Sequence, residues 1–525
     1  MLEDHNPVFG KNVIETLSEG MYDNPLFLFR EYVQNSTDAI DAAEKCGILK
    51  NGEGEIIINI NGNEREISFE DNGTGIPKDE VPRMLANIGD SQKDRKQNKG
   101  FRGIGRLGGL GYCKKVRFET SAKYESTKTI LEWDANMLHE ILADKDEHIH
   151  AGDLIRRITT IKYVPCDNSL HFFKVSMIGI NDNNDELLEV DEVRKYLSMV
   201  APVPFDYEKF MFKEEISKFL EENNLPEPQT YNLFLNGDQV YKGYESPLRI
   251  EGHKDIEILG VECHPIKLED TILGWYWFCV TSYEGVLPTK CWQRCMRLRK
   301  SNIQIGEADC ISNHPKRGIS LWREERSNNY FIGEVHALDD DLIPNSRRDY
   351  FNQDDACRQF ESALTEEFAG LYDLYRYASV LRNKNKAISS ANQAEREFID
   401  KDQTGGFYNN QDRITEKEKL DKLKAQVPAA QKTIDNIKKK STTNSALGKL
   451  VEKFESEVVP ATSPTTNTNT FESQKSGQKK GFVKDKLSKD GRRVLRKVFE
   501  VINSTSILDE NQAKLLCDAI VKKFA

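Results

Sequence analysis

The sequence lacks the features that mark secreted and membrane-spanning proteins. Its first residues, MLEDHNPVFGKN, have no basic stretch followed by an apolar run, so we predict no secretion signal. The most apolar window, residues 272–286, is too short to span a membrane and predicts a buried strand. The ten cysteines include no repeated pair with zinc-ligand spacing. We therefore expect free thiols in a reducing, cytoplasmic protein that does not contact membranes.

Excess positive charge is also absent. The chain has 74 basic and 85 acidic residues and a net charge of −11, which argues against coating nucleic acid or an anionic membrane. Its 525 residues exceed what one hydrophobic core can organise, so three or more structural units are expected.

Residues 1–200 predict an α+β unit. A helical pattern covers 25–46, with Asn24 as a plausible cap ahead of Pro25. Because strand signals follow one another with few helices between them, an antiparallel or mixed sheet is favoured over a doubly wound parallel one. The predicted strands are 55–60, 65–71, 114–123, 128–134, 153–164 and 171–180.

The rest of the chain predicts a second α/β unit and a helical region. The α/β unit covers residues 201–375, and its clearest strand is 329–338. A helical or coiled-coil arm is expected over 376–454, broken at Gly405 and Gly406. Residues 455–482 have linker composition, and 483–525 predict two amphipathic helices. The apolar stripes of those helices predict a dimer contact, although a docking module would show the same stripes.

The segment REYVQNSTDAIDAA (30–43) places three polar side chains on one helical face. Glu31, Asn35 and Asp38 fall within a narrow sector at about 100° per residue. Glu31 could orient and deprotonate a water, and Asn35 offers an amide oxygen to Mg²⁺. The simpler interpretation is a solvated face of an amphipathic helix.

Two glycine-containing strings follow. In SFEDNGTGIP (68–77), Asp71 at a strand end can accept a hydrogen bond from the amine of adenine, unless the string is an ordinary Asp-Asn-Gly turn. GFRGIGRLGGLGY (100–112) leads clustered glycines into a helix and can expose backbone N–H groups to anions, although flexible loops are glycine-rich too. This string is neither a Rossmann fingerprint nor a P-loop.

Together, the three segments resemble the signature of the GHKL ATPases (gyrase, heat shock protein 90, histidine kinase, MutL). The entry YDNPLFLFREYVQNSTDA (22–39) is most similar to the heat shock protein 90 chaperones, whereas GFRG (100–103) is closer to MutL. The resemblance implies a Bergerat sandwich, a mixed sheet covered by helices, that binds ATP and Mg²⁺ and hydrolyses ATP. It implies the following residues: Glu31 as general base, Asn35 as Mg²⁺ ligand, Asp38 as a further nucleotide contact, Asp71 as adenine reader, Gly73 and Gly75 around the base, Ser91 and Lys93 in a lid, and Gly100, Gly103 and Gly105 around the phosphates.

The resemblance extends to the second unit. LIPNSRRDYF (342–351) is similar to the chaperone loop of a transducer domain that brings an arginine to the γ-phosphate. Aligning Asn345 and Ser346 points to Arg347, with Arg348 as the competitor. The alternative is a structural pair of Arg348 with Asp349.

Three functions remain open at the level of sequence. The first is an ATP-driven conformational clamp, a homodimer that acts on a client protein or partner subunit as a chaperone does. The second is a nucleic-acid clamp of the MutL or MORC type in genome maintenance or antiviral defence, since 471–500 has ten basic and four acidic residues. The third is an interaction scaffold whose ATP site hardly turns over.

Overall fold

The computed structural model divides into two compact units, Met1–Thr462 and Ser463–Ala525. It describes residues 9–18, 24–87, 105–312 and 321–458 (without 443), and a few single residues nearer the C-terminus. All helices and strands below belong to the first unit. The predicted linker 455–482 and the last two helices lie almost entirely outside the described residues.

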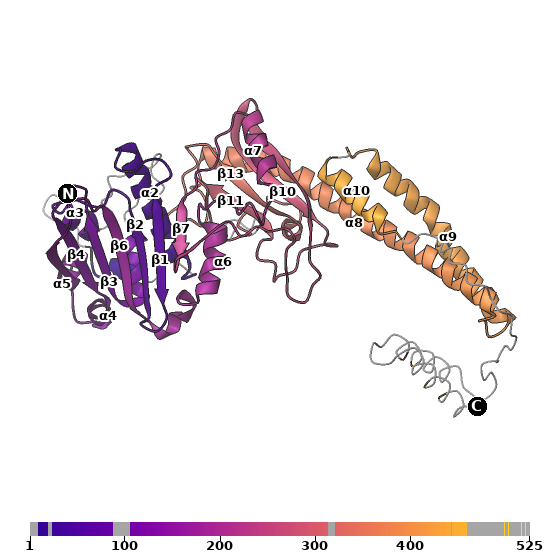
Figure 1. The fold of residues 1–525 in the computed structure, drawn as a ribbon, viewed down its shortest axis with the longest axis horizontal. Coiled ribbons are helices and arrows are strands. Elements are labelled where there is room, and N and C mark those ends of the chain that lie inside the picture. Colours follow the sequence, from indigo (N-terminus) through magenta and orange to yellow (C-terminus); the bar gives the residue numbers. More distant parts are fainter. Residues whose placement is uncertain are drawn as a thin grey trace, which may run out of the picture. The chain divides into compact units, whose positions relative to one another are not determined.

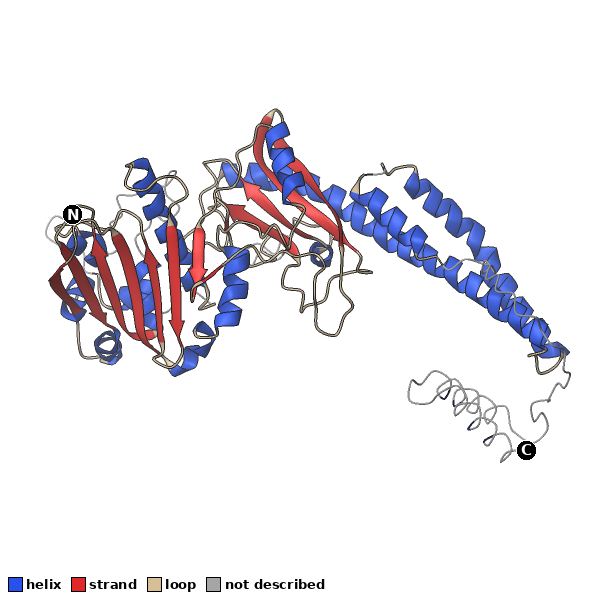
Figure 2. Ribbon diagram, viewed as in Figure 1, coloured by secondary structure: helices blue, strands red, loops and turns tan. Residues whose placement is uncertain are grey.

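The first sheet has eight strands in the order β5-β4-β3-β6-β2-β1-β7-β8 (Figures 1 and 2). Every neighbouring pair is antiparallel except β1 and β7, so the sheet is mixed, as predicted. Its strands are β1 (Glu55–Asn61), β2 (Glu66–Asp71), β3 (Cys113–Ser121), β4 (Thr127–Asp134), β5 (Thr159–Pro165), β6 (Phe172–Ile180), β7 (Asn232–Leu235) and β8 (Asp238–Gln239).

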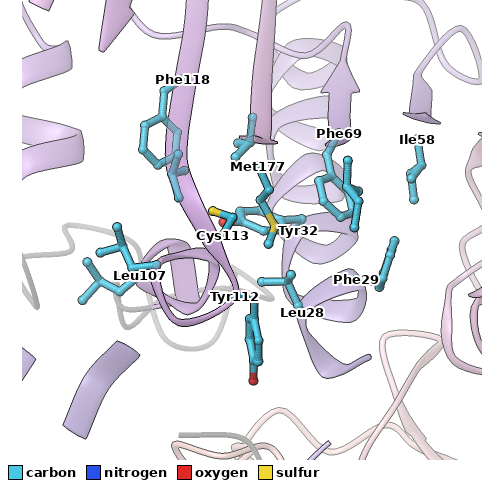
Figure 3. Close-up of a cluster of buried hydrophobic side chains, with 14 of the residues drawn as sticks. Leu28, Phe29, Tyr32, Ile58, Phe69, Leu107, Tyr112, Cys113, Phe118 and Met177 are labelled. Atoms are coloured by element: carbon cyan, nitrogen blue, oxygen red, sulfur yellow. The ribbon is translucent and has the colours of Figure 1, made fainter. Parts of the chain in front are cut away.

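The core of this sheet lies between its inner face and helix α2 (Phe27–Lys45). Strand β1 alternates buried and more exposed side chains, which puts Ile56, Ile58 and Ile60 on the core face. Figure 3 shows Leu28, Phe29 and Tyr32 of α2 gathered with Phe69 and Met177 of the strands. The apolar side of α2 is thereby fixed against the sheet.

The remaining helices of this region are short. They are α1 (Asn12–Ser18), α3 (Val81–Ala86), α4 (Ala135–Ala143), α5 (Ala151–Ile158), α6 (Val190–Val200) and two 3₁₀ helices, η1 (Gly105–Gly111) and η2 (Asp182–Leu187). The strand predicted over 153–164 was wrong in its first half. Leu154, Ile155 and Ile158 recur at helical spacing and are buried on one face of α5.

The second sheet has the order β12-β11-β13-β10-β9. The window 272–286 was predicted as a buried strand, and β10 forms over most of it with its last nine residues buried. The elements are β9 (Ile258–Leu268), β10 (Thr271–Thr281), β11 (Cys295–Lys300), β12 (Ile303–Gln304) and β13 (Ile332–Ala337), with α7 (Lys213–Glu222) and the 3₁₀ helix η3 (Glu325–Tyr330).

Three helices follow the second sheet: α8 (Asp355–Thr404), α9 (Asn410–Lys438) and α10 (Ala446–Ser456). Helices α8 and α9 pack along each other (Figure 1). The predicted break falls where α8 ends, because Gly405 caps it in the left-handed conformation at φ 66°. None of the described helices is long and apolar enough to cross a membrane.

The predicted domain limits remain predictions, and the elements do not all follow them. Strands β7 and β8 lie beyond residue 200 and still complete the first sheet. Helix α8 runs through residue 375 without a break.

Candidate functional site

Helix α2 presents its polar face beside the apolar face that covers the sheet. Leu28, Phe29 and Tyr32 are buried, whereas Glu31 and Asn35 are half-buried and Asp38 is 4% exposed. The spacing of three and four residues keeps these polar groups on one side of the helix. The helix therefore places Glu31, Asn35 and Asp38 on one face.

Glu31 lies between two guanidinium groups. Its Oε1 atom is 3.5 Å from Nη2 of Arg30 and 3.8 Å from Nε of Arg348. The same oxygen is buried and has no hydrogen-bond partner among the described residues. A buried carboxylate oxygen normally has such a partner, so this position suits a water or a ligand.

Gly105 at the start of η1 allows the backbone to approach Glu31 closely. A β-carbon added at Gly105 would lie 3.1 Å from Oε2 of Glu31. Among the predicted glycines of the third string, the structure therefore brings Gly105 to the general-base candidate. Gly100, Gly103, Ser91 and Lys93 lie outside the described residues.

The two arginines of the 342–351 loop point differently. Arg348 is 7% exposed and forms the ion pair with Glu31, whereas Arg347 is exposed and its carbonyl oxygen accepts a hydrogen bond from Arg30 at 3.3 Å. The cause is a turn in which the Arg348 N–H bonds the Asn345 carbonyl and Arg348 takes a positive φ of 54°. The comparison of Asn345 and Ser346 with the chaperone loop selects Arg347 as the residue that meets the γ-phosphate. The geometry of the loop favours Arg348 for that role instead.

A second part of the site lies at the end of β2. Asp71 is 3% exposed, and its Oδ1 accepts a hydrogen bond from the Gly73 N–H at 3.0 Å. A β-carbon at Gly73 would lie 2.6 Å from that of Ala39, and one at Gly75, where φ is 64°, would lie 1.9 Å from the Ser121 carbonyl oxygen. Both positions therefore require glycine.

The structure adds two residues to this part of the site. The Thr120 hydroxyl accepts a hydrogen bond from the Ile76 N–H at 2.8 Å and donates one to the Phe172 carbonyl. The His171 ring lies 2.8 Å, through Nδ1, from the carbonyl oxygen of Gly73. Both residues lie in strand or loop segments with no recognisable motif, so no sequence pattern points to them.

Unsatisfied polar groups cluster near Glu31. Gln34 is 1% exposed, and neither its amide oxygen nor its amide nitrogen has a hydrogen-bond partner in the described part of the chain. The same holds for the Tyr196 hydroxyl of α6, whose pKa is raised by burial and which interacts electrostatically with Arg30 and Glu31. Buried polar groups without partners are costly, and a bound polar ligand or water would satisfy them.

The described ends of segment 88–104 are held together. Arg106 donates a hydrogen bond to the Asn87 carbonyl, and its own carbonyl accepts one from the Tyr32 hydroxyl at 3.3 Å. Burial lowers the pKa of Arg106 to about 10. Asn87 and Arg106, which flank residues 88–104, are thus joined, and Arg106 contacts α2.

The side chains of the site fit a Mg²⁺ ion that takes most of its ligands from phosphate and water oxygens. The described residues contain no group of three or more His, Cys, Asp and Glu side chains that could hold a metal. Mg²⁺ in phosphate-binding sites commonly takes one or two protein oxygens, with phosphates and water as the other ligands. Asn35, on the same helical face as Glu31, can supply such an oxygen.

Comparison with known families supports this interpretation of the first sheet and α2. Residues 27–156 match the family described as histidine kinase-, DNA gyrase B-, and HSP90-like ATPase. The match covers about a quarter of the chain and includes Glu31, Asn35, Asp71 and Gly105. No curated protein matches the chain. Residues 27–156 are therefore similar to the GHKL ATPases, and this similarity does not separate a chaperone from a nucleic-acid clamp.

Proposed function

We propose that the chain is an ATP-hydrolysing clamp of the heat shock protein 90 type, which cycles between conformations as it binds and hydrolyses ATP. The observation that carries the proposal is the meeting of three separate segments at one carboxylate. Glu31 from α2 lies within 3.8 Å of Arg348, and Gly105 of η1 lies so close that a β-carbon added to it would be 3.1 Å from Oε2 of Glu31. Clamps of this kind need a site whose parts belong to regions that can move relative to one another.

In the proposed reaction, Glu31 accepts a proton from the water that attacks the γ-phosphorus of ATP. The bond from that phosphorus to the β–γ bridging oxygen breaks, and ADP and phosphate leave. Asp71 holds the adenine amine, and Asn35 would hold Mg²⁺, which offsets phosphate charge when it is bound. Arg348 offsets negative charge on the phosphoryl group once it leaves Glu31.

In the proposed cycle, the state without nucleotide is the one in which Glu31 is paired with Arg30 and Arg348. Two guanidinium groups near the carboxylate compete with water for its lone pairs. An ATP γ-phosphate offers Arg348 a better partner, because it carries more negative charge and more acceptor oxygens. Arg348 would then shift from the base to the substrate, which couples nucleotide binding to movement of the loop after β13.

Substitution of Glu31 tests the proposal. Glu31→Ala should retain ATP binding and lose turnover by ~10²–10⁴-fold, the usual contribution of a positioned general base. Glu44→Ala on the same helix is the matched control, since Glu44 accepts the Gly52 N–H away from the site, and it should turn over normally. Turnover by Glu31→Ala at the rate of the parent protein would remove Glu31 from the mechanism.

The client distinguishes the proposed clamp from its alternative. Stimulation of turnover by an unfolded protein supports a chaperone, whereas stimulation by duplex DNA supports a MutL- or MORC-like clamp. No turnover with Glu31 intact would favour the scaffold. Trapping the Glu31→Ala protein with ATP and identifying what co-purifies would name the partner.

A further inference from the structure

A cavity lies where the loop after β10 and the 3₁₀ helix η3 meet helices α8 and α10. It has a volume of about 230 Å³, and its walls come from η3, the loop after β10, and helices α8 and α10. Its lining is unusual for its size, with two arginines, two tyrosines and a serine beside Phe454 of α10. None of these residues takes part in the nucleotide site proposed above.

One face of helix α8 lines this cavity with polar side chains. Tyr375, Ser379 and Arg382 are spaced by four and three residues, so they lie on one face of the helix. Ala378 lies among them and leaves room in the lining. The polar groups are therefore presented by a rigid element rather than by a loose loop.

Arg382 is positioned and carries an uncompensated charge. It donates to the Glu284 carbonyl oxygen at 3.2 Å and to the Ser379 hydroxyl at 3.5 Å. Within the described ranges no carboxylate pairs with it, because the Glu284 carboxylate pairs with Lys386 and Glu324 pairs with Arg326. A guanidinium has five N–H donors, so several remain for a ligand.

Gly285 makes room for this guanidinium. A β-carbon at Gly285 would lie 2.7 Å from Nη1 of Arg382 and nothing else would come as close. Gly285 also has a φ of 117°, which other residues rarely adopt. The loop after β10 is thus shaped so that Arg382 can reach the cavity.

The other walls of the cavity are aromatic. Tyr330 and Tyr375 meet edge to face with ring centroids 5.5 Å apart. A tyrosine hydroxyl can donate as well as accept a hydrogen bond, so Tyr330 and Tyr375 each bring one donor to the cavity. Arginine forks with hydroxyl donors suit a phosphate, and aromatic walls suit a planar or apolar carrier group.

We propose that this cavity binds a small phosphate monoester carried on an aromatic or apolar group. Arg382 and the hydroxyls of Ser379 and Tyr375 hold the phosphate, and the tyrosine rings and Phe454 contact the carrier. The volume is below the range of about 300–1,000 Å³ usual for drug-sized ligands, so a whole nucleotide is too large. Because α8, α10, η3 and the loop after β10 all contribute walls, the bound ligand would tie these elements together.

The test is calorimetric titration of the full chain with phenyl phosphate, with saturating ADP and Mg²⁺ present to occupy the nucleotide site. Phenyl phosphate should bind more tightly than inorganic phosphate, and phenol should not bind. Arg382→Gln should weaken binding about tenfold or more, the effect of losing charge-assisted hydrogen bonds. Arg376→Gln, an exposed arginine on the same helix outside the cavity, should bind as the parent protein does.

Two further variants keep the test decisive if Arg382→Gln is poorly folded. Arg382→Lys retains the charge and loses the fork, so it should bind with intermediate affinity. Tyr375→Phe retains the ring and should lose a smaller part of the affinity. Phenyl phosphate that does not bind the parent protein, or that binds the Arg382 variants as tightly as the parent, overturns the proposal. The outcome is independent of whether the protein hydrolyses ATP.

Discussion

At the scale of single residues, Asp71 makes the choice of base testable. Its buried carboxylate accepts a hydrogen bond from the Gly73 N–H, and a carboxylate has about four lone-pair sites with which it can also accept one from the amine of adenine. Guanine would present a carbonyl oxygen to the same lone pairs, at a cost of ~1–3 kcal/mol or more. ATP should therefore bind more tightly than GTP in calorimetry, and equal affinities would contradict the assignment.

Substitution separates the role of Asp71 in binding from a role in chemistry. Asp71→Asn should weaken ATP binding and leave the turnover of saturated protein nearly unchanged. Glu70→Gln is the matched control, because successive side chains of a strand point to opposite faces and Glu70 pairs with Lys174 instead. A large drop in saturated turnover in the Asp71 variant would mean that the residue also acts in the reaction.

The arginine that meets the phosphate is the second prediction at this scale. Arg348→Ala should lower turnover by ~10³-fold or more, within the range for arginines that offset phosphoryl charge, and Arg347→Ala should have a smaller effect. The reason is the turn at Asn345, which directs Arg348 inward to Glu31. A steady-state ATPase assay on both variants decides between them. Loss of activity in Arg347→Ala alone would restore the assignment made from the sequence alignment.

At the scale of elements, a buried ionic cluster links the strands of the second sheet. Glu334 of β13 contacts the Lys242 ammonium at 2.9 Å, the Arg299 guanidinium at 2.6 Å and the His336 ring at 3.0 Å, and all four side chains are at most 6% exposed. Removing one partner of such a cluster leaves an uncompensated buried charge. Strands β11 and β13 and the segment after β8 are therefore joined by this cluster.

His336 gives this cluster a predicted pH dependence. Burial lowers the pKa of His336 to about 4 from its ordinary value of 6.5, against the opposing effect of Glu334. The unfolded chain then binds a proton that the folded chain does not, so this contribution to stability is lost as pH falls from about 6.5 to about 4. Urea unfolding at several pH values should show that fall.

Variants identify the group responsible. His336→Gln should flatten the stability profile between those pH values, even if it lowers stability throughout. His264→Gln is the control, since the His264 side chain is 44% exposed and lies in the same sheet. Profiles for the parent protein and His336→Gln that differ only by a constant would mean that another group titrates.

Most of the helices and strands in the two sheets and the arm follow patterns that the sequence shows. Strands β1 to β4 and β6 follow alternating or apolar runs, and α8 and α9 follow long helical patterns separated by two glycines. Helix α5 was missed because it is short and is followed directly by β5, so that the two together resemble one strand rich in β-branched residues. The pairing of β7 with β1 joins residues more than 170 positions apart, and local patterns carry no information on such contacts.

The residues of the proposed nucleotide site also fall into two groups, those that local patterns predict and those that only tertiary contacts bring together. Motif spacing predicts Glu31, Asn35 and Asp71 as site residues, because helix and strand periodicity determine which residues share a face. Thr120 and His171 join the site through hydrogen bonds between distant segments, and the choice of Arg348 depends on the turn conformation. Such tertiary details follow from packing rather than from local sequence.

At the scale of the whole molecule, the tail after α10 carries the prediction of dimerisation. The stripes predicted over 494–502 and 513–524 include Val498 and Leu516, whose side chains are 40% and 42% exposed. Two short helices cannot bury such stripes against each other alone, and pairing with a second copy would complete a four-helix unit. Such a unit would hold two ATPase regions near each other and raise their effective concentration.

Truncation after Val459 tests this role, because α10 ends at Ser456 and stays intact. The full chain should sediment as a dimer, and the truncated protein should be a monomer without nucleotide. It should still bind ATP, because Asn35 and Asp71 remain, but turn it over more slowly at low concentration. Val498→Asp in the full chain should weaken the dimer in the same way, since it places a charge in the apolar stripe. A truncated protein that sediments as a dimer without ATP would move the contact from the tail to the arm formed by α8 and α9.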